Sequence, residues 1–281
     1  MKYFIDIEFL EGTQKRKIGN IELPKYFNTK NTIDLISIGI VVEDGTEYYA
    51  ISKDFNLKEA WNRWQWKDEG NSVGIRIGVL SKYTKEYWIR ENILKSIFKE
   101  WVKEDKNWTN KEITLGNWDF NYRNFKYFLN KYGKTNKQIA EDIKSIIFTP
   151  DKVEYTDIYP NTYPKNIEFY GYYADYDWVV FCWLFGKMKD LPKGFPMYCI
   201  DLKQEIDSKI NLMKKYRVTS TLKLEVIDFL SGKNITFEEA EKMDWDKWFK
   251  KHIKYPKQTN EHNALADAKW NFELYKFLNT L

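Results

Sequence analysis

The sequence has few residues that cross-link a chain or hold zinc. Its 281 residues include two cysteines, Cys182 and Cys199, which form no C-x-x-C motif. This argues against both a disulfide framework and a cysteine-based zinc site. It also has only two histidines, His252 and His262, so any histidine chemistry has two candidates.

Long apolar stretches are also missing. No apolar run reaches the roughly 18 residues that a membrane-spanning helix needs, and no basic segment followed by an apolar one opens the chain. We therefore expect a cytoplasmic protein with no membrane partner. The net charge is only +4, from 45 basic and 41 acidic residues, so any surface for a polyanion must be local.

Aromatic residues, in contrast, are abundant. They make up 18% of the chain, while 43% of all residues are hydrophobic. A chain of this length and composition can form a sizeable core. Some of the aromatic side chains are then available to stack on nucleobases or on a partner.

The first predicted strand, residues 2–9, carries two acids within an apolar run. Residues two apart in a strand point to the same face, so Asp6 and Glu8 project together, while Ile5, Ile7 and Phe9 point into a core. Like charges on a mostly buried strand repel each other and are costly to desolvate. A divalent cation held by the carboxylates relieves both costs. The alternative is an exposed edge strand with two solvated acids.

Two further strands follow the first. Residues 33–42 and 48–51 are rich in β-formers and flank an Asp-Gly pair, which predicts a hairpin and hence a three-stranded meander. Residues 10–31 are polar and are predicted to be a loop. Its basic residues 15–17 either contact a phosphate backbone or are simply solvated.

The next hundred residues are mainly helical in pattern. Apolar spacing predicts helices at 56–63, 85–103 and 120–132, and a fourth helix after the capping box of Thr135 and Gln138. We interpret residues 55–150 as a largely helical elaboration of one domain, residues 1–281. A lid, a dimer surface and a substrate clamp are all open as its role.

A strand that runs directly into a helix follows near the middle of the chain. Residues 167–173 form the predicted strand, and the helix behind it ends at Gly186. Asp177 falls in the first helical turn, where a carboxylate is favoured electrostatically, so ordinary capping is one explanation for it. Residues 197–200 are predicted to be a short strand, and Asp201 to cap the next helix. Residues 236–239 resemble another capping box.

The last predicted helix begins near Leu265. His262 and Asp267 are five positions apart, which places them about 140° apart around a regular helix. Both can reach one site only if His262 lies on the loop before the helix. A structural hydrogen-bond donor is the alternative role for a histidine in this position.

Four motifs in this order resemble a known family. They are FIDIEFL (4–10), ISIGIV (36–41), YYADYDW (172–178) and HNALAD (262–267). The sequence resembles the DEDDh branch of the 3′–5′ exonucleases, and within it the compact polyadenylate-specific 3′-exoribonuclease type. The resemblance implies an α/β fold with a ribonuclease H-like mixed sheet flanked by helices.

The resemblance also implies a metal site made of four carboxylates, Asp6, Glu8, Asp177 and Asp267. These would hold two divalent ions, Mg²⁺ or Mn²⁺, which stabilise the charge that builds up on the attacking and leaving oxygens of a phosphodiester. The middle motif offers two acids, and Asp177 is preferred to Asp175 because it follows an aromatic residue at a helix start. His262 is then the general base, since an imidazole with an ordinary pKa of about 6.5 accepts a proton at neutral pH.

The implied substrate is single-stranded RNA, cut from its 3′ end to release nucleoside 5′-monophosphates. Phe9 and Leu10 would contact the terminal base, and Arg90 and Asn92 the terminal phosphate or sugar. For these residues, structural roles in the core or on a helix surface are the alternatives. Salt is expected to weaken backbone contacts made by Lys and Arg.

Three alternatives stay open at this level. One is a 3′–5′ exodeoxyribonuclease, since RNA and DNA are distinguished by contacts to the 2′-OH that the sequence does not identify. Another is a catalytically silent nucleic-acid-binding domain, although such a domain has no use for four clustered acids. The third concerns assembly, since a homodimer is as compatible with the sequence as a monomer.

Overall fold

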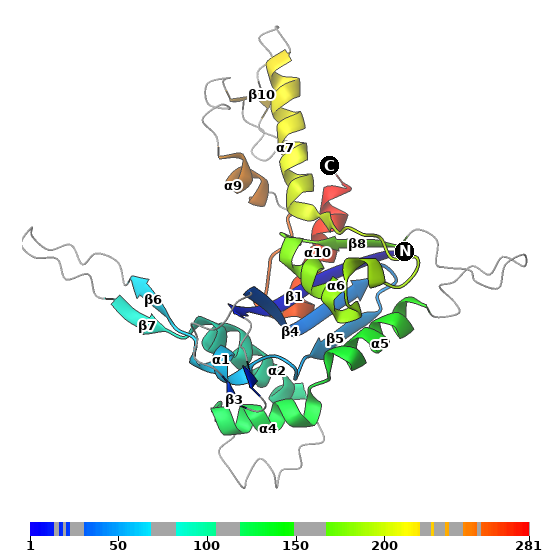
Figure 1. Cartoon of the computed structure of the whole chain (residues 1–281). Coiled ribbons are helices and arrows are strands. Elements are labelled where there is room, and N and C mark those ends of the chain that lie inside the picture. Colours follow the sequence, from blue (N-terminus) through cyan, green and yellow to red (C-terminus); the bar gives the residue numbers. More distant parts are fainter. Residues whose placement is uncertain are drawn as a thin grey trace, which may run out of the picture.

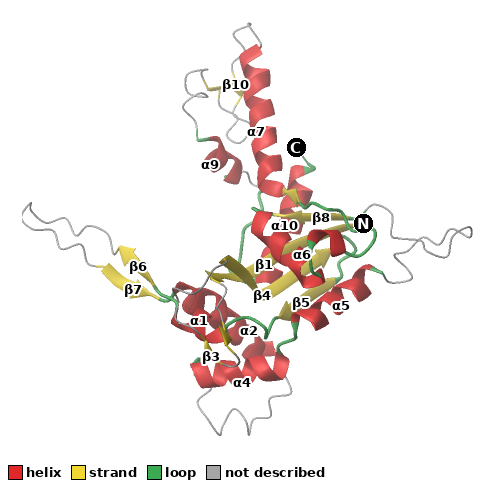
Figure 2. Cartoon of the chain, viewed as in Figure 1, coloured by secondary structure: helices red, strands yellow, loops and turns green. Residues whose placement is uncertain are grey.

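A five-stranded mixed β-sheet forms the centre of the molecule. The computed structural model describes residues 1–13, 17–18, 21–22, 31–68, 83–104, 119–148, 167–219, 226–227, 234–235, 244–251 and 254–280. The sheet has the order β5 (Glu47–Ile51), β4 (Asn31–Val42), β1 (Lys2–Thr13), β8 (Glu168–Gly171) and β9 (Ile200–Asp201). Neighbours are antiparallel from β5 to β1 and parallel from β1 to β9 (Figures 1 and 2). The expectation of a mixed α/β fold is confirmed.

The predicted N-terminal meander is present, but its first two strands are longer than expected. β1 continues to Thr13 and pairs with β4 as far as Asn31, so the prediction of a loop over residues 10–31 is wrong at both ends. Two short strands, β2 (Lys17–Ile18) and β3 (Ile21–Glu22), also pair within this region. Cross-strand pairing here overrides the polar composition from which the loop was inferred.

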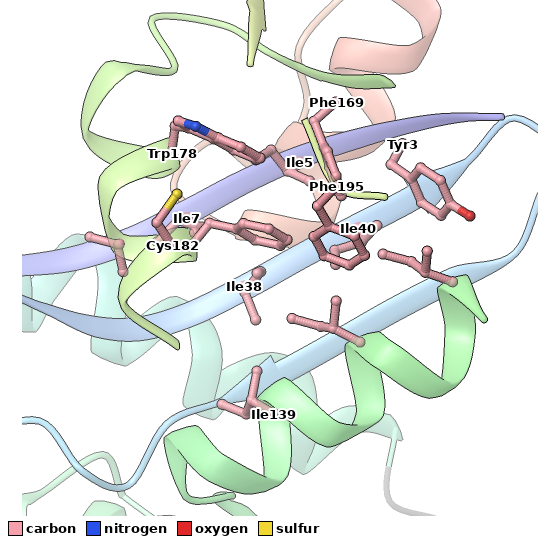
Figure 3. Close-up of a cluster of buried hydrophobic side chains, with 14 of the residues drawn as sticks. Tyr3, Ile5, Ile7, Ile38, Ile40, Ile139, Phe169, Trp178, Cys182 and Phe195 are labelled. Atoms are coloured by element: carbon pink, nitrogen blue, oxygen red, sulfur yellow. The ribbon is translucent and has the colours of Figure 1, made fainter. Parts of the chain in front are cut away.

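Helices α5 (Asn136–Ile147) and α6 (Asp175–Phe185) cover one face of the sheet. Figure 3 shows Ile5, Ile7 and Ile38 of the sheet meeting Ile139 of α5 and Trp178 of α6 in one buried cluster. The predicted capping box is confirmed, because the side chains of Thr135 and Gln138 each bond the other's backbone at the start of α5. Helix α6 ends at Gly186, as predicted, where φ is +117°.

The opposite face carries two separate apolar clusters. In the first, α7 (Leu202–Thr219) and α10 (Ala264–Leu278) pack against Phe4 and Val41 of the sheet. Asp201 caps α7 as predicted, since its Oδ1 accepts hydrogen bonds from the backbone N–H groups of Lys203 and Gln204.

The second cluster joins most of the predicted helical elaboration to the sheet. Leu10, Ile36 and Ile51 pack there against α1 (Leu57–Asn62), α2 (Lys95–Glu104), α4 (Tyr122–Tyr132) and a π-helix, η2 (Ile89–Leu94). The helix predicted over 85–103 therefore starts late, because strand β7 (Tyr83–Glu86) occupies its first residues. The region is divided between the two faces, since α5 lies on the other side of the sheet.

Several smaller elements complete the description. Strand β7 pairs with β6 (Gln65–Asp68) in a hairpin that projects from the body beside α1 (Figure 1). The others are η4 (Met188–Asp190), β10 (Val226–Ile227), β11 (Asn234–Ile235) and α9 (Trp245–Lys250). The strand predicted at 197–200 is wrong except at its last residue, since β9 covers only Ile200 and Asp201. Among the described helices, none has the length and apolarity to cross a membrane.

Candidate active site

The outward face of β1 places two acids between two apolar anchors. Phe4 and Leu10 are fully buried, each in a different cluster, and Asp6 and Glu8 lie between them on the same face. Glu8 is only 9% exposed. The pair is therefore fixed in a gap between two hydrophobic cores.

A glycine brings a third acid to the same place. Gly39 of β4 lies directly opposite Asp6, and a Cβ there would come within 2.2 Å of the carbonyl oxygen of Ala264. Without that Cβ, the first turn of α10 rests on the sheet. Asp267, one turn into α10, is consequently buried beside Asp6 and Glu8.

The fourth acid enters where β1 outruns its parallel neighbour. β8 pairs with β1 only as far as Phe4, and no other described strand pairs with the later residues of β1 on that side. Asp177 fills part of this gap, because its Oδ1 accepts a hydrogen bond of 2.8 Å from the N–H of Ile7. Asp175, the other acid of that motif, is exposed to solvent.

Burial and mutual repulsion disfavour the ionised forms of these acids. Burial, joined by the charges of Asp177, Glu8 and Asp267, raises the pKa of Asp6 well above its ordinary value. Burial, together with the charges of Asp267 and Asp177, raises the pKa of Glu8 to about 8. Burial also raises the pKa of Asp177 to about 7, although the hydrogen bond from Ile7 opposes the rise.

These groups fit a hard divalent cation. The ligand oxygens of Asp6, Glu8 and Asp267 lie within 4.8 Å of one another, so this cluster can hold a metal ion. Asp177 is close enough for its charge to act on both Asp6 and Glu8. Carboxylate oxygens are the preferred ligands of Mg²⁺ and Mn²⁺, and bound positive charge would reverse the pKa shifts.

His262 lies on the loop before α10, as the spacing predicted. Its φ is +66°, in the left-handed region, and its backbone N–H donates to Oδ2 of Asp267 at 2.9 Å. The other oxygen of Asp267 accepts a 2.6 Å hydrogen bond from Gln258. Burial raises the pKa of Asp267, and these two hydrogen bonds oppose the rise. Gln258 thus orients the carboxylate of Asp267, and that carboxylate in turn holds the backbone of His262 in place.

Two residues of the helical elaboration hold the His262 loop, and sequence reasoning missed both. The ring of Trp88 meets the imidazole of His262 edge-on at 4.8 Å between centroids. Glu100 accepts short hydrogen bonds from Asn260 and Asn263, on either side of His262. No local motif marks these contacts, because their partners are over 150 positions away in the chain.

The four residues expected to contact substrate lie in different environments. Phe9 is half-buried, contacts Tyr176 and lines a pocket of about 330 Å³ that Trp88 also borders. Leu10 is 1% exposed and lies in the core, so it offers no surface to a nucleotide. Arg90 stacks on Tyr87 and pairs with Glu91, while Asn92 donates to the carbonyl of Trp88.

Of the remaining predictions, some concern residues outside the described part of the chain and others concern residues within it. His252, residues 15–16 and the capping box expected at 236–239 lie outside the described residues. Cys182 and Cys199 are both free thiols. The expected structural role of Asp201 extends beyond its cap, since its Oδ2 also accepts from the N–H of Ala174 before α6.

A mixed α/β fold with buried carboxylates gathered at one sheet strand defines a candidate metal-binding protein. No family model matches the chain. It is similar to two curated proteins from two strains of Mycobacterium tuberculosis, each named a 3′-5′ exoribonuclease. The identity to each is 24% over 204 residues, which cover 73% of this chain and 73% of each relative.

Proposed function

We propose that this chain is a divalent-metal-dependent 3′–5′ exoribonuclease that releases nucleoside 5′-monophosphates from single-stranded RNA. One observation carries the proposal: β1 and α10, which lie at opposite ends of the sequence, bring Asp6, Glu8 and Asp267 within metal-binding distance. Asp177, from α6, adds its charge to the same cluster. The similarity to proteins named as exoribonucleases supports the same reaction.

The four carboxylates are the residues that would hold two ions, Mg²⁺ or Mn²⁺. When bound, these ions supply Lewis acids that stabilise negative charge on the attacking and leaving oxygens. The chain's contribution is to fix the ligands before substrate arrives. Phe4 and Leu10 anchor β1 on both sides of Asp6 and Glu8, and the N–H of Ile7 orients Asp177.

His262 is proposed to take a proton from the attacking water at one of its imidazole nitrogens. The loop that carries it is attached to Asp267 through its backbone and to Trp88 through its ring. Both contacts limit the directions in which the imidazole can point. A general base must lie within hydrogen-bond reach of the proton it removes, so this restraint serves catalysis.

The finer description of the fold belongs to the same proposal. A sheet with three antiparallel strands followed by two strands parallel to β1, and helices on both faces, supports a ribonuclease H-like architecture. We propose that residues 1–281 form one exonuclease domain, with residues 55–150 as its elaboration, because Leu10, Ile36 and Ile51 share a core with that region. We propose the cytoplasm as its compartment.

The direct test is incubation with single-stranded RNA and DNA labelled at either end. With Mg²⁺ or Mn²⁺ we expect RNA to shorten from its 3′ end to nucleoside 5′-monophosphates, and with chelator we expect no cleavage. Faster cleavage of DNA would make the protein an exodeoxyribonuclease. No metal-dependent cleavage of either substrate would contradict the proposal.

Two aspartates of α6 supply a matched pair of variants for this assay. Asp177→Asn removes a buried carboxylate of the cluster, whereas Asp175→Asn removes an exposed one two residues away. We expect the first to abolish cleavage and the second to leave it within about twofold, as for most exposed substitutions. Equal effects would remove Asp177 from the site.

A further inference from the structure

Two tryptophans are exposed at the β6–β7 hairpin, Trp64 directly before β6 and Trp66 within it. Trp64 is 42% exposed and Trp66 is 60% exposed. Their rings meet edge-on, with centroids 5.0 Å apart. An isolated two-stranded hairpin is only marginally stable in water. Two adjoining exposed indoles on it form an apolar patch of the kind that marks a binding surface.

The two faces of the hairpin differ in chemistry. Trp66 lies opposite Lys85 in the pairing of β6 with β7, and the Lys85 ammonium lies 4.3 Å from the centroid of the Trp64 ring. This aromatic face, consisting of Trp64, Trp66 and Lys85, therefore combines two π-surfaces with a cation. On the other face, Glu86 accepts hydrogen bonds from Gln65 and Lys67, which offset its negative charge.

A pocket lies between Trp64 of the aromatic face and residues that adjoin the candidate active site. It has a volume of about 330 Å³, and its lining includes Phe9, Trp64 and Trp88. Phe9 directly follows Glu8 along β1, and Trp88 contacts the imidazole of His262. Trp88 therefore joins the pocket to the His262 loop, and Trp64 joins it to Trp66.

We propose that the aromatic face of the hairpin is a stacking platform for single-stranded RNA, which takes bases upstream of the 3′-terminal nucleotide. The proposal rests on the proposed function for the position of the 3′ end. Successive bases stack on aromatic side chains whatever their sequence, and nearby cations attract the backbone. Such a platform would hold long substrates and have no effect on very short ones.

The two exposed indoles and the Lys85 cation beside them favour RNA over a protein partner as the occupant. Arg63 lines the pocket and pairs with Glu59 at 3.2 Å, while Lys85 lies on the aromatic face itself. Two acids, Glu11 and Glu86, also line the pocket, but Glu86 is paired with Lys67 at 3.2 Å. Aromatic rings interleaved with cations, in continuity with a phosphodiester-cleaving site, match the chemistry of single-stranded nucleic acid.

The test compares substrate lengths in the full-length protein. For Trp66→Ala we expect KM for an oligonucleotide of about 12 nucleotides to rise roughly 10-fold, and kcat/KM for one of about 3 nucleotides to stay within twofold. Trp66→Tyr keeps an aromatic ring and should retain most of the affinity. Trp183→Ala on α6 is the matched control, because Trp183 is similarly exposed, at 51%, and lies outside the hairpin.

A binding measurement separates failure of the platform from failure of the proposed function. Fluorescence anisotropy of the labelled 12-nucleotide RNA in chelator reports binding without cleavage. If the protein binds RNA in a Trp66-dependent manner but cleaves nothing, the platform stands and the exoribonuclease proposal fails. If Trp66→Ala matches wild type at every length, loses activity equally at all lengths, or changes the oligomeric mass in light scattering, the platform is overturned.

Discussion

The two faces of β1 differ in what burial achieves. On one face, Ile5 and Ile7 enter a continuous hydrophobic core with α5 and α6. On the other, Asp6 and Glu8 lie in a gap between two cores and are joined by Asp177 and Asp267. The first face lowers the free energy of the fold through apolar contact, while the second raises it through desolvation and like-charge repulsion.

The difference shows which part of the strand serves the fold and which serves a ligand. Buried carboxylates without cationic partners persist only where something compensates for them. A bound divalent ion does so at this place, because its charge is opposite and its ligands are oxygen atoms. Substitutions on the acidic face should therefore lower activity and raise stability, and those on the apolar face should lower stability and leave activity nearly unchanged.

The largest effect is expected from Asp6→Asn. This change removes a negative ligand from the centre of the cluster, and we expect kcat/KM to fall on the order of 10⁴-fold, equivalent to several kcal/mol of transition-state stabilisation. In chelator, the variant should unfold at a higher temperature than wild type, because repulsion on that face is reduced. If the variant is active, or is less stable than wild type in chelator, Asp6 serves the fold and not a metal ion.

His262→Ala should affect turnover but not metal binding. Removal of a general base is expected to lower kcat by about 10³-fold. The imidazole is not among the grouped metal ligands, so the affinity for Mn²⁺ measured by calorimetry should stay near the wild-type value. A wild-type rate in this variant would end the assignment of His262 as the base.

Ile7→Ala probes the opposite face and should give the reverse pattern. Loss of a large buried side chain is expected to lower the free energy of unfolding by about 2–5 kcal/mol. The backbone N–H that holds Asp177 is retained, so kcat of the folded protein should change only a few-fold. Denaturant unfolding and kinetics on the same sample measure both. A large loss of kcat without loss of stability would contradict the division between the faces.

The smallest effect is the pH dependence of the metal-free fold. The pKa of Glu8 is raised to about 8 and that of Asp177 to about 7, against ordinary values of 4.5 and 3.8. Folding therefore favours the protonated forms, and the stability that these groups contribute is present below about pH 4 and lost as pH rises to about 8. We expect the Tm in chelator to fall between pH 5.5 and 8 by at least roughly 2–4 °C, about 1 kcal/mol.

Two controls separate this trend from the titration of other groups. Glu8→Gln should flatten the pH dependence, since its side chain does not ionise. Added Mg²⁺ should raise the Tm of the wild-type protein most at the higher pH, because the carboxylates are then already deprotonated and can bind the ion without losing protons. A Tm that rises with pH in chelator would contradict the raised pKa values.

Local patterns in the sequence predicted much of this arrangement. Alternation along β1 placed Asp6 and Glu8 on one face, and the five-residue spacing from Asp267 placed His262 on a loop. The capping box at Thr135 depends on neighbours three residues apart, so it too could be recognised without the fold. Such features are encoded within a few residues.

The rest depended on contacts between distant parts of the chain. Strand β1 extends to Thr13 because β4 pairs with it there, not because of its own composition. Trp88 and Glu100 approach the His262 loop only once η2 and α2 have packed on the sheet. Leu10 was expected at the substrate, yet its neighbours in the fold enclose it in the core.

The acidic face of β1 is proposed to bind two divalent cations, and the number of bound ions can be measured. Electron paramagnetic resonance counts bound Mn²⁺ directly when wild type and Asp6→Asn are titrated side by side. The account predicts two ions per chain in wild type, fewer in the variant, and a rise in Tm only where ions bind. A wild-type protein that binds no Mn²⁺ and has the same Tm with and without it would contradict the account.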